Sequence, residues 1–345
     1  MNSWYLDKGP DNDVIISSRI RLARNFKKHP FPNRINYEQA QNIISEIKDI
    51  GLKSSSYIAK EFNYLEMSKI NDIDKYVLLE KHLISQDLIK NSSISSSLIS
   101  KDEKTSIMVN EEDHIRIQTI LPGMQLKEAW ELGDRIDNFI EEKVEYAYNE
   151  NIGYLTSCPT NVGTGMRASV MVHLPALTMI GYINGLLSTI GKLGIVVRGI
   201  YGESSQVSGN MYQISNQITL GQSEEDIIQS INSVVMQIIE QERMARNKIL
   251  KGSPIELEDK IYRSYGIFTN ARMLSSNECL SLLSEIRLGI DLGIISNIST
   301  KDANELMIIT QPAFIQKTVG RILEEKERDV KRAEIIRKHL MKKEG

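Results

Sequence analysis

Residues 110–120, which read NEEDHIRIQTI, restrict the fold of this 345-residue chain more than any other stretch. Ile115 and Ile117 alternate with Arg116 and Gln118, and this period of two predicts a β-strand with one buried face. Residues 105–109 predict a second strand that enters the same motif. The sequence therefore predicts two adjacent strands that meet at a highly charged connection.

Three acids stand at the head of the second strand. Glu111, Glu112 and Asp113 precede Arg116 on the same segment. Two interpretations remain open: the acids form a solvated loop, or their carboxylates bind a cationic group beside an arginine that binds an anion. The second interpretation describes a site that joins a positive substrate to a negative one.

Composition excludes several classes of function. Forty-two Lys and Arg residues stand against 45 Asp and Glu, a net charge of -3, so we expect no nucleic-acid partner and no membrane partner. Cys158 and Cys279 form no CxxC pair and no Cys/His cluster, which argues against a disulfide framework and a structural zinc site. No signal peptide and no membrane span is evident, so we expect a cytoplasmic protein without a metal site made by its own residues.

A basic strand is predicted near the start of the chain. Residues 13–18 read as a strand that continues into Arg19 and Arg21. Two residues apart on extended backbone point to the same face, so these guanidinium groups should lie side by side. Either an anion such as phosphate lies between them, or the segment is a basic surface strand.

The remaining elements follow from periodicity and turn residues. Length gives a soft expectation of two domains, and Gly252-Ser253-Pro254 is the best linker. We expect helices at 37–50, 125–148, 170–190, 224–244, 277–288, 300–309 and 325–342, strands at 194–198 and 211–216, a β-like run at 76–79, and a loop or frayed helix end at 91–100.

A loop rich in Gly, Thr and Asn follows a predicted strand near residue 154 and closes on Arg167. Its glycines allow backbone to approach a ligand closely, although no GxxxxGK[ST] motif occurs. Cys158 is either a small buried hydrophobe or a thiolate stabilised by the cationic loop. His82 is likewise either a structural histidine or a ligand group.

Five arginines end predicted strands or close predicted loops: Arg19, Arg21, Arg116, Arg167 and Arg198. Together they describe a site for a triphosphate without a P-loop, in which arginines and a magnesium ion surround the phosphates. The anionic or potentially anionic groups Glu112, Glu203 and Cys158 suit a cationic acceptor. A guanidinium held by carboxylates, one of which removes its proton, meets this description.

These residues carry a resemblance to a known family. Ser17-Ser18-Arg19-Ile20-Arg21, residues 110–116, Cys158-Pro159-Thr160-Asn161, Arg167-Ala168-Ser169 and Arg198-Gly199 with Gly202-Glu203 occur in the order and approximate spacing of the ATP:guanidino phosphotransferases, the creatine and arginine kinase family. The chain is more similar still to the bacterial protein-arginine kinase branch, the partner of the Clp protease machinery, over nearly its full length.

The resemblance implies a fold and a set of roles. It implies an α+β catalytic domain over residues 1–250, an antiparallel β-sheet flanked by helices, followed by a smaller helical domain over 253–345. It makes Glu112 and Glu203 the guanidinium-binding carboxylates, Glu112 the base, and Cys158 the reactive cysteine. It implies that ATP is bound through Ser17, Ser18, Arg19, Ile20, Arg21, His82, Arg116, Arg167, Ala168, Ser169, Val170, Met171, Arg198, Gly199, Ile200, Tyr201, Gly202 and Glu203.

Two departures from the small-molecule kinases shape the expected function. Only sixteen residues precede Ser17, so we expect the N-terminal lid over a free amino acid to be missing, which favours an arginine on a protein. The added helical segment holds Arg328-Asp329-Val330-Lys331-Arg332-Ala333. Val330, Ala333, Ile336 and Leu340 form an apolar stripe there, and Asp329 can pair with Arg332. The segment is either a solvated helix face or, as the resemblance implies, an allosteric phosphoarginine site at Arg328, Asp329, Arg332 and Ala333.

We therefore expect a protein-arginine kinase that uses ATP and Mg²⁺ and acts on proteins with exposed arginine. The resemblance also implies an activator protein, a Clp-type unfoldase, a role in stress response, and a homodimer formed through the helical segment. Two alternatives stay open: a phosphagen kinase acting on free arginine, and an inactive adaptor that binds phosphoarginine.

Overall fold

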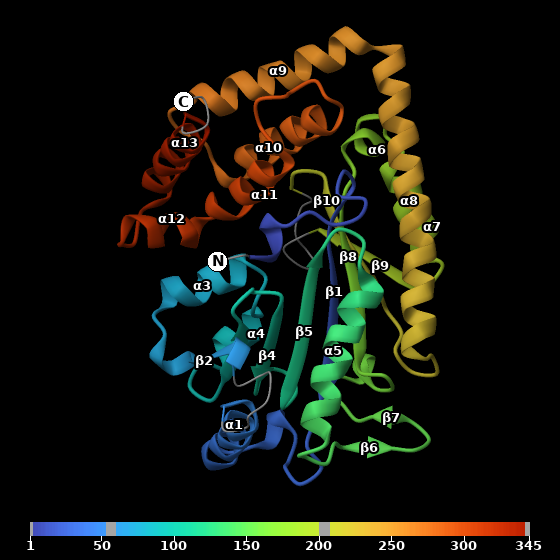
Figure 1. Ribbon diagram of the computed structural model, residues 1–345, viewed down its shortest axis with the longest axis vertical. Coiled ribbons are helices and arrows are strands. Elements are labelled where there is room, and N and C mark those ends of the chain that lie inside the picture. The colour runs from blue at the N-terminus through green and yellow to red at the C-terminus, as the bar shows by residue number, and fades with distance from the viewer. Residues whose placement is uncertain (1–2, 53–59, 200–207, 342–345) are drawn as a thin grey trace.

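An eight-stranded antiparallel sheet forms the centre of the molecule, in the order β2-β3-β4-β5-β1-β8-β10-β9 (Figure 1). The computed structural model describes residues 3–52, 60–199 and 208–341. The strands are β1 (Ile15–Arg24), β2 (Phe62–Glu66), β3 (Ser96–Ser100), β4 (Thr105–Val109), β5 (Ile115–Pro122), β8 (Met166–His173), β9 (Ile195–Gly199) and β10 (Met211–Asn216). A separate hairpin joins β6 (Tyr148–Asn149) to β7 (Gly153–Tyr154).

One face of the sheet packs against helices and forms the main core. Ile20 and Leu22 of β1 point into it and are almost fully buried, as the alternation with Arg19 and Arg21 requires. The helices that cover this face are α1 (Tyr37–Leu52), α5 (Leu126–Glu141) and α8 (Glu224–Gly252), each of which contributes isoleucines to the same buried cluster. In Figure 1, α5 crosses in front of β1 and β5.

Shorter elements complete the sheet-containing part of the chain. They are η1 (Trp4–Leu6), η2 (Pro32–Arg34), η3 (Met67–Lys69), α3 (Asp72–Glu80), α4 (Gln86–Lys90), η4 (Pro159–Asn161), α6 (Pro175–Met179) and α7 (Ile183–Gly191). Among the described residues, every helix is too short or too polar to cross a bilayer. The sheet, its flanking helices and the helical C-terminal region confirm the predicted α+β fold.

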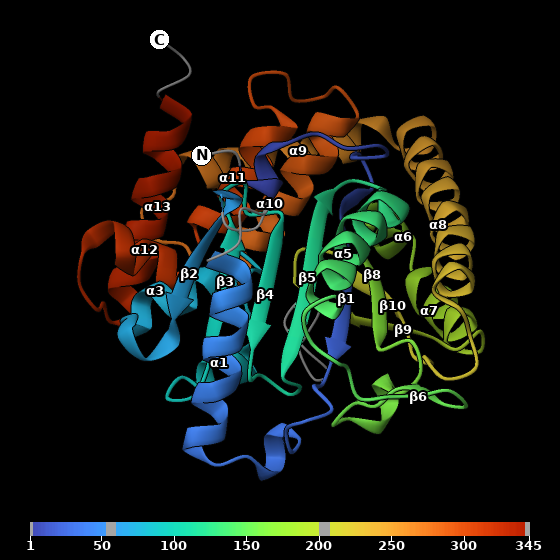
Figure 2. The same ribbon diagram turned by 60° about the horizontal axis from the view of Figure 1, so that its bottom comes forward.

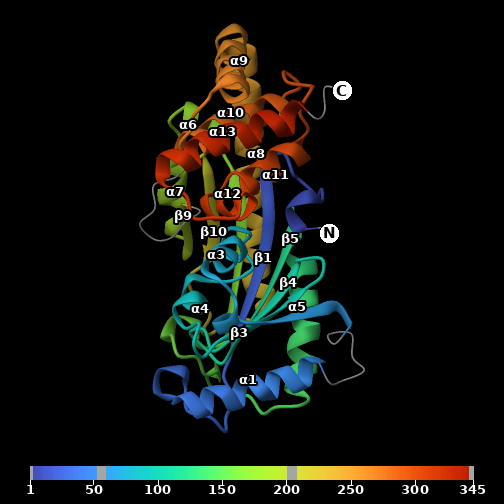
Figure 3. The ribbon, with the colours of Figure 1, turned by 90° about the vertical axis from the view of Figure 1, so that its left-hand side faces the viewer.

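Five helices gather at the end of the sheet opposite α1 (Figure 3). They are α9 (Pro254–Asn270), α10 (Ser276–Asp291), α11 (Thr300–Ile309), α12 (Pro312–Val319) and α13 (Glu325–Met341). Leu257, Ile261 and Leu283 from these helices share a second buried cluster with Trp4 and Met171. The C-terminal helices are therefore joined to both the N-terminal segment and the sheet by apolar packing.

Buried charges reinforce this junction. Arg246 of α8 donates from Nε to Glu242 at 2.8 Å and from Nη2 to the Asp13 carbonyl at 3.0 Å. Glu242 in turn accepts the backbone N–H groups of Ala176 and Leu177, which caps the start of α6. Because each of these groups is buried, each depends on the others for its hydrogen bonds.

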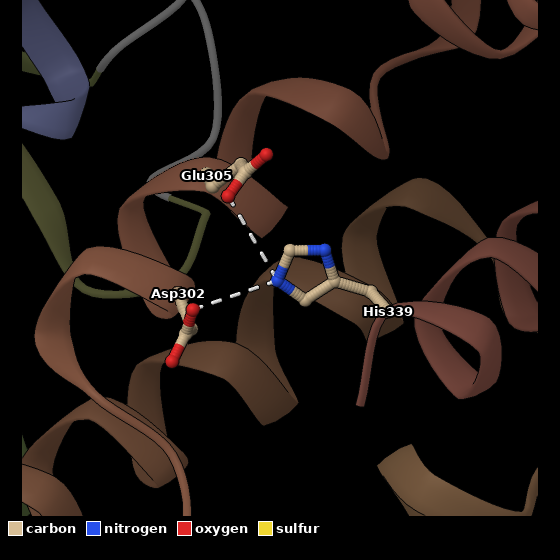
Figure 4. A group of neighbouring side chains, drawn as sticks. All are labelled: Asp302, Glu305 and His339. Carbon is tan, nitrogen blue, oxygen red and sulfur yellow. Dashed lines mark ion pairs between the residues drawn. The ribbon is translucent and has the colours of Figure 1, made fainter. Parts of the chain in front are cut away.

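A histidine joins α13 to α11 (Figure 4). The His339 Nε2 atom lies 3.6 Å from Asp302 Oδ1 and 3.9 Å from Glu305 Oε2. These three side chains are the only group of three potential metal ligands within the described ranges. When His339 is protonated it can form ion pairs with both acids, so the contact has a structural explanation without a metal.

The structure differs from the sequence expectation in three places. Residues 76–79, predicted as β-like, lie in α3. Asn71 caps the N-terminus of this helix, because its side-chain oxygen accepts a hydrogen bond from the Asp74 N–H at 2.9 Å. The serine-rich stretch predicted as a loop contains β3, a fully buried strand paired on both sides. The helix predicted over 170–190 is wrong at its start, because Val170 to His173 belong to β8 and the helices begin only at Pro175. A continuous apolar run does not distinguish a central strand from a buried helix.

Other boundaries differ by a few residues to about two turns. The helix predicted over 125–148 ends at Glu141, and the one predicted over 224–244 extends to Gly252. In α13, Ala333 and Ile336 are buried as expected, whereas Val330 of the predicted stripe is 46% exposed. Only the part of the stripe that faces α9 and α12 is covered.

Arg332 of α13 is a buried anchor for the C-terminal helices. Its guanidinium donates to the Thr310 carbonyl at 2.8 Å, the Leu274 carbonyl at 2.7 Å, Asp329 at 2.6 Å and Ser276 at 2.7 Å. The side chain is 1% exposed. The predicted pair of Asp329 with Arg332 is confirmed, and it forms part of a buried network in which Arg332 makes four hydrogen bonds.

We predict that Arg332→Ala lowers the free energy of unfolding by about 3–5 kcal/mol, because it leaves Asp329 and two carbonyls without their donor. Denaturant unfolding followed by circular dichroism measures the change. Arg321→Ala is the matched control, since Arg321 is exposed, pairs with Glu327 and donates to the carbonyl of the adjacent Ile322, so its loss should change stability far less. Equal effects of the two substitutions would contradict the anchoring role.

Candidate active site

The five predicted phosphate-binding arginines lie on one face of the sheet, opposite the main core. Across β1 and β8, Arg21 is the direct partner of Arg167, and across β1 and β5, Ala23 is the partner of Arg116. Across β10 and β9, Gln213 is the partner of Arg198, and Gln213 also opposes Met171 of β8. Because residues two apart share a face, this register alone brings all five guanidinium groups to the same side.

The guanidinium groups repel one another. Burial, together with Arg116 and Arg167, lowers the pKa of Arg19 to about 10. Burial and the neighbouring arginines also hold the pKa of Arg21 and that of Arg167 below the ordinary value. The Nε atom of Arg21 is buried and has no hydrogen-bond partner among the described residues. Such a cluster is costly unless a polyanion binds to it.

A cavity of about 570 Å³ lies over this face of the sheet. The loop between β7 and β8, the acidic connection before β5, and the sheet itself form its walls. Its lining residues are Arg21, Ala23, Asp87, Glu112, Arg116, Cys158, Thr160, Asn161, Gly165, Arg167, Val196, Arg198 and Gln217. We call this cavity the arginine pocket. Four of the five predicted arginines line this pocket, and so do two of the predicted catalytic residues, Glu112 and Cys158.

Arg116 lies between two glutamates. Its Nη1 donates to Glu111 Oε1 at 2.6 Å and its Nη2 donates to Glu112 Oε2 at 2.7 Å. The Glu111 side chain is fully buried, whereas that of Glu112 is 38% exposed and faces the pocket. Burial raises the pKa of Glu112, Arg116 lowers it, and Glu111, Asp113 and Asp87 raise it further. Glu112 is therefore a carboxylate with increased proton affinity at the edge of a cationic site.

The other charged residues of this connection hold its shape. Asp113 is buried and accepts from Asn25 Nδ2 at 2.6 Å and from the Ser157 N–H at 2.7 Å. His114 Nδ1 accepts from the Phe26 N–H at 2.9 Å, so its Nε2 is the donor to the Pro30 carbonyl at 2.8 Å. Burial lowers the pKa of His114 to about 4, which agrees with this neutral tautomer.

His82 lies beside Arg19 at a much smaller cavity next to the arginine pocket. Ser17, Arg19, His82, Ile120, Ser169, Met171 and Gln213 line it. Burial, with a smaller contribution from Arg19, lowers the pKa of His82 to about 4, so the ring is neutral near pH 7. The His82 carbonyl accepts from Gln118 Nε2 at 2.7 Å, which ties the residue to β5. A neutral ring can accept or donate a hydrogen bond without adding to the positive charge.

Cys158 is half-buried at the start of η4 and lines the arginine pocket. Its Sγ lies 3.0 Å from Thr160 Oγ1. Asn161, three residues on, donates from Nδ2 to Glu112 Oε2 at 3.5 Å, a long contact. The loop therefore places a thiol and an amide beside the exposed carboxylate.

Some of the predicted ATP-binding residues do not face the pocket. Ile20, Ala168 and Val170 point into the main core, and Ser18 donates to the Gly123 carbonyl and accepts from the Gln125 N–H. Only their backbone could contribute to binding. Gly199 ends β9, whereas Ile200, Tyr201, Gly202 and Glu203 lie outside the described residues. The Arg328 and Asp329 motif lies on α13, in the helical layer and away from the pocket.

The structure adds residues that the sequence did not single out. Glu111 was one of three adjacent acids, and no pattern showed that it alone lies behind Arg116. Asn161 belongs to a motif quoted for the resemblance, but no role was predicted for it. Asp87 and Gln217 come from segments far from the motifs, and only the fold brings them to the pocket.

Comparison with known proteins decides the family. The sequence model described as "ATP:guanido phosphotransferase, C-terminal catalytic domain" matches residues 42–245, and "Protein-arginine kinase McsB C-terminal domain" matches residues 254–345. The chain belongs to the ATP:guanido phosphotransferase family, in its protein-arginine kinase branch. This kinase is thus a phosphotransferase, and ATP is the substrate that its family implies.

Individual relatives agree over the whole length of the kinase. A "Protein-arginine kinase" of Geobacillus sp. (strain WCH70) is 53% identical over 344 residues, covering 100% of this chain and 95% of the relative. That of Bacillus subtilis (strain 168) is 53% identical over 340 residues, covering 99% and 93%. A crystal structure of lombricine kinase is similar with a TM-score of 0.60 and 26% identity, covering 70% of this chain and 71% of the other.

A second solved structure shows the same fold at lower identity. The duplicated taurocyamine kinase from Schistosoma mansoni has a TM-score of 0.60 and 24% identity, covering 74% of this chain and 38% of that one. The fold of the sheet that carries the arginines is therefore shared with the lombricine and taurocyamine kinases.

We predict that Asp87→Asn moves the acid limb of the pH-rate profile to lower pH. The resemblance implies that Glu112 is the base, and a base acts only when deprotonated. Because the pKa of Glu112 is raised, a base at this position would lose activity at a higher pH than a glutamate of ordinary pKa. Removing the Asp87 charge, which raises that pKa, extends activity toward acid. Initial rates over a pH series at constant ionic strength measure the shift. Asp72→Asn, exposed on α3, is the control, and an unmoved limb in Asp87→Asn would exclude Glu112 as the titrating group.

Proposed function

We propose that this kinase transfers the γ-phosphate of ATP to the guanidinium group of arginine side chains in proteins. The observation that carries the proposal is the convergence of five arginines on one face of the sheet beside the exposed carboxylate of Glu112. The names and near-complete coverage of the relatives support arginine on a protein as the acceptor.

The arginines would bind the phosphates of ATP and offset the charge that moves during transfer. Arg21, Arg116, Arg167 and Arg198 line the pocket, and Arg19 lies beside His82 at its margin. Arg19 donates to Gln213 Oε1 at 2.9 Å, which holds its side chain along the sheet. Burial and mutual repulsion lower the pKa of Arg19, Arg21 and Arg167, and binding a polyanion here would relieve the repulsion.

Magnesium would enter with the nucleotide. Within the described residues, no group of three metal-ligating side chains lies in the arginine pocket. Mg²⁺ commonly keeps several waters and binds substrate phosphates, so a protein cage is not required. The ion would supply charge to the phosphates, while the chain's arginines and carboxylates position the two substrates.

Transfer needs a base and an acceptor site, and Glu112 provides both. The acceptor nitrogen would form a bond to the γ-phosphorus as the bond from that phosphorus to the bridging oxygen of ADP breaks. The proton lost by the nitrogen would pass to the Glu112 carboxylate. The incoming guanidinium would displace Arg116 Nη2 from Glu112, while the fully buried Glu111 keeps Arg116 Nη1 in place. Arg116 is thereby free to turn one edge toward phosphate.

Further roles follow from the resemblance and remain proposals. Glu203 would be the second guanidinium-binding carboxylate, and Cys158, which lines the same pocket as Glu112, the reactive cysteine. The matched C-terminal family model supports a division into residues 1–250 and 253–345. It also supports a phosphoarginine site on α13, where Arg328 donates to the Leu323 carbonyl at 2.8 Å beside Asp329, and where Arg332 and Ala333 are buried.

The biological setting is proposed on the same basis. We propose a cytoplasmic kinase that works as a homodimer, with an activator protein and a Clp-type unfoldase as partners and a role in stress response. Membership in the protein-arginine kinase branch supports each of these proposals. The sequence and fold do not favour any particular protein substrate.

A phosphagen kinase that acts on free arginine is the second candidate, favoured by the likeness to lombricine kinase. We predict strong incorporation of phosphate into an unfolded acceptor such as casein and little turnover of free arginine. Mass spectrometry under neutral conditions, which preserve the acid-labile P–N bond, places the phosphate on arginine. Efficient turnover of free arginine without modification of the protein would overturn our choice.

We predict that Glu112→Gln lowers kcat on a protein acceptor by roughly 10²–10⁴-fold, the range expected for loss of a general base. Binding of ATP should change little, because the substitution keeps the side chain's size. Glu145→Gln, an exposed residue paired with Lys27, serves as the control and should retain full activity. Full activity of Glu112→Gln would exclude Glu112 as the base and assign proton removal to another group. A parent protein that phosphorylates neither casein nor free arginine would favour the third candidate, an inactive phosphoarginine-binding adaptor.

A further inference from the structure

A second large cavity lies beside the arginine pocket and has no role in the proposed chemistry. Its volume is about 830 Å³, and its lining residues come from the end of α5, the β6–β7 hairpin, the loop at Gly163 and the start of α8. In the ribbon of Figure 2, β6 lies at the lower right, below α5 and α8. We call it the acidic groove. Its lining residues are Glu141, Tyr148, Glu150, Asn151, Ile152, Gly153, Tyr154, Gly163, Thr164, Thr219, Leu220, Gly221, Gln222 and Glu224. Three of these described residues are glutamates, and none is a lysine or an arginine.

Helix stability does not account for all of this negative charge. Glu224 stands in the first turn of α8, where a carboxylate complements the helix dipole. Glu141 is the last residue of α5, where a carboxylate faces the negative end of the dipole and no basic residue lies in the last turn. Burial and the neighbouring Asp137 raise the pKa of Glu141 as well. Arg24 lowers that pKa and offsets part of the rise, but its guanidinium is turned to Asp137 and Tyr154 and does not line the groove.

Two tyrosines form one wall of the acidic groove. Tyr154 is fixed from behind by Arg24, whose guanidinium carbon lies 3.5 Å from the ring centroid and whose Nη2 pairs with Asp137 at 2.7 Å. Tyr148 contacts Tyr154 edge to face, with centroids 5.2 Å apart, and remains 55% exposed. An exposed tyrosine ring beside carboxylates suits a guanidinium or ammonium group, which can stack on the ring while it pairs with an acid.

Apolar side chains are exposed along the same groove. Ile152 is 43% exposed and Leu220 is 54% exposed, and both line it. A small basic molecule would leave these surfaces uncovered. A polypeptide segment that carries basic and apolar side chains would contact all of the groove's features.

The acidic groove and the arginine pocket share one loop. Tyr154 exchanges two backbone hydrogen bonds with Gly163, and Thr219 Oγ1 donates to the carbonyls of Thr160 and Val162. Gly163 has a φ of +112°, and a Cβ there would lie 2.4 Å from the Thr219 carbonyl oxygen, so only glycine permits this close packing. Thr164 lines the groove and Gly165 lines the pocket, so the two cavities lie on either side of this loop.

We propose that the acidic groove is a docking site for the acceptor protein, and that it binds a basic and apolar segment near the arginine that is phosphorylated. This inference rests on the proposed function, because it assumes that the acceptor is a polypeptide. Because three glutamates and no basic residue line the groove, the segment that binds there should be cationic. Docking there would raise the local concentration of acceptor arginine at Glu112.

The test neutralises the groove without changing its shape. The triple variant Glu141→Gln, Glu150→Gln and Glu224→Gln is compared with a matched control in which three exposed glutamates on α8 and α9 change, Glu240→Gln, Glu256→Gln and Glu258→Gln. We expect the groove variant to raise KM for casein by roughly 3–10-fold and to flatten its salt dependence, with kcat and KM for ATP unchanged. The control should match the parent.

A binding measurement without ATP separates this proposal from the proposed function. Fluorescence anisotropy of a labelled Arg- and Leu-containing peptide should show weaker binding to the groove variant than to the parent or the control. A parent enzyme that modifies no protein would overturn the proposed function, yet the peptide would still report on the groove. Unchanged KM and unchanged peptide affinity in the groove variant would overturn docking. If the groove variant changed its oligomeric state and kept the KM of the parent for casein, the groove would be assigned to contact with a second copy of the chain. That outcome would also overturn the docking proposal.

Discussion

The structure depends on a repulsive arrangement: a β-sheet that places like charges directly opposite each other. Arg21 faces Arg167 across β1 and β8, and Arg19 lies close enough to both Arg116 and Arg167 for its pKa to fall. Such pairs destabilise a sheet by themselves. The opposite face offsets the cost, because Ile20, Leu22 and their neighbours are buried there against α5 and α8. A strong core on one face permits an unneutralised anion site on the other.

Arg116 connects the two halves of the proposed chemistry. It belongs to the cationic cluster through its place in the sheet, yet it is paired with both Glu111 and Glu112. The pair is asymmetric, because Glu111 is buried and Glu112 is exposed. A guanidinium from solvent can therefore compete for Glu112 without reaching Glu111. The ion pair between Arg116 and Glu112 would therefore be the contact that exchanges when the acceptor binds.

The helical C-terminal region is joined to the sheet by apolar packing and by buried polar bonds. The two arginines that the resemblance implies for phosphoarginine binding differ in their contacts. Arg332 is buried and donates to four protein groups, whereas Arg328 donates to one carbonyl of the same helical layer. Met171 of β8 belongs to the buried cluster that also contains Leu283 of α10. A strand that carries Arg167 is thus packed at its other end against the C-terminal helices.

Alternation identified β5 and the arginine face of β1, because a period of two fixes which residues share a side whatever the neighbours are. Alternation failed at Val170, because the central strand β8 has apolar residues on both faces and its sequence resembles a buried helix. It also failed at Ser96 and Ser97, because a run of serines shows no apolar alternation although β3 pairs on both sides. Strand pairing is non-local, so no single segment contains it.

The sequence by itself determined the kinds of groups at the site: five arginines, an acidic run, a thiol and the order of motifs that identifies the family. Only the tertiary structure decided their partners. It separated three adjacent acids into a buried anchor, an exposed carboxylate and a structural acid, because the turn before β5 points consecutive side chains in different directions. It also brought Asp87 and Gln217 to the arginine pocket and gathered Glu141, Glu150 and Glu224 into a groove. Residues so distant in sequence meet only when the sheet and its helices have assembled.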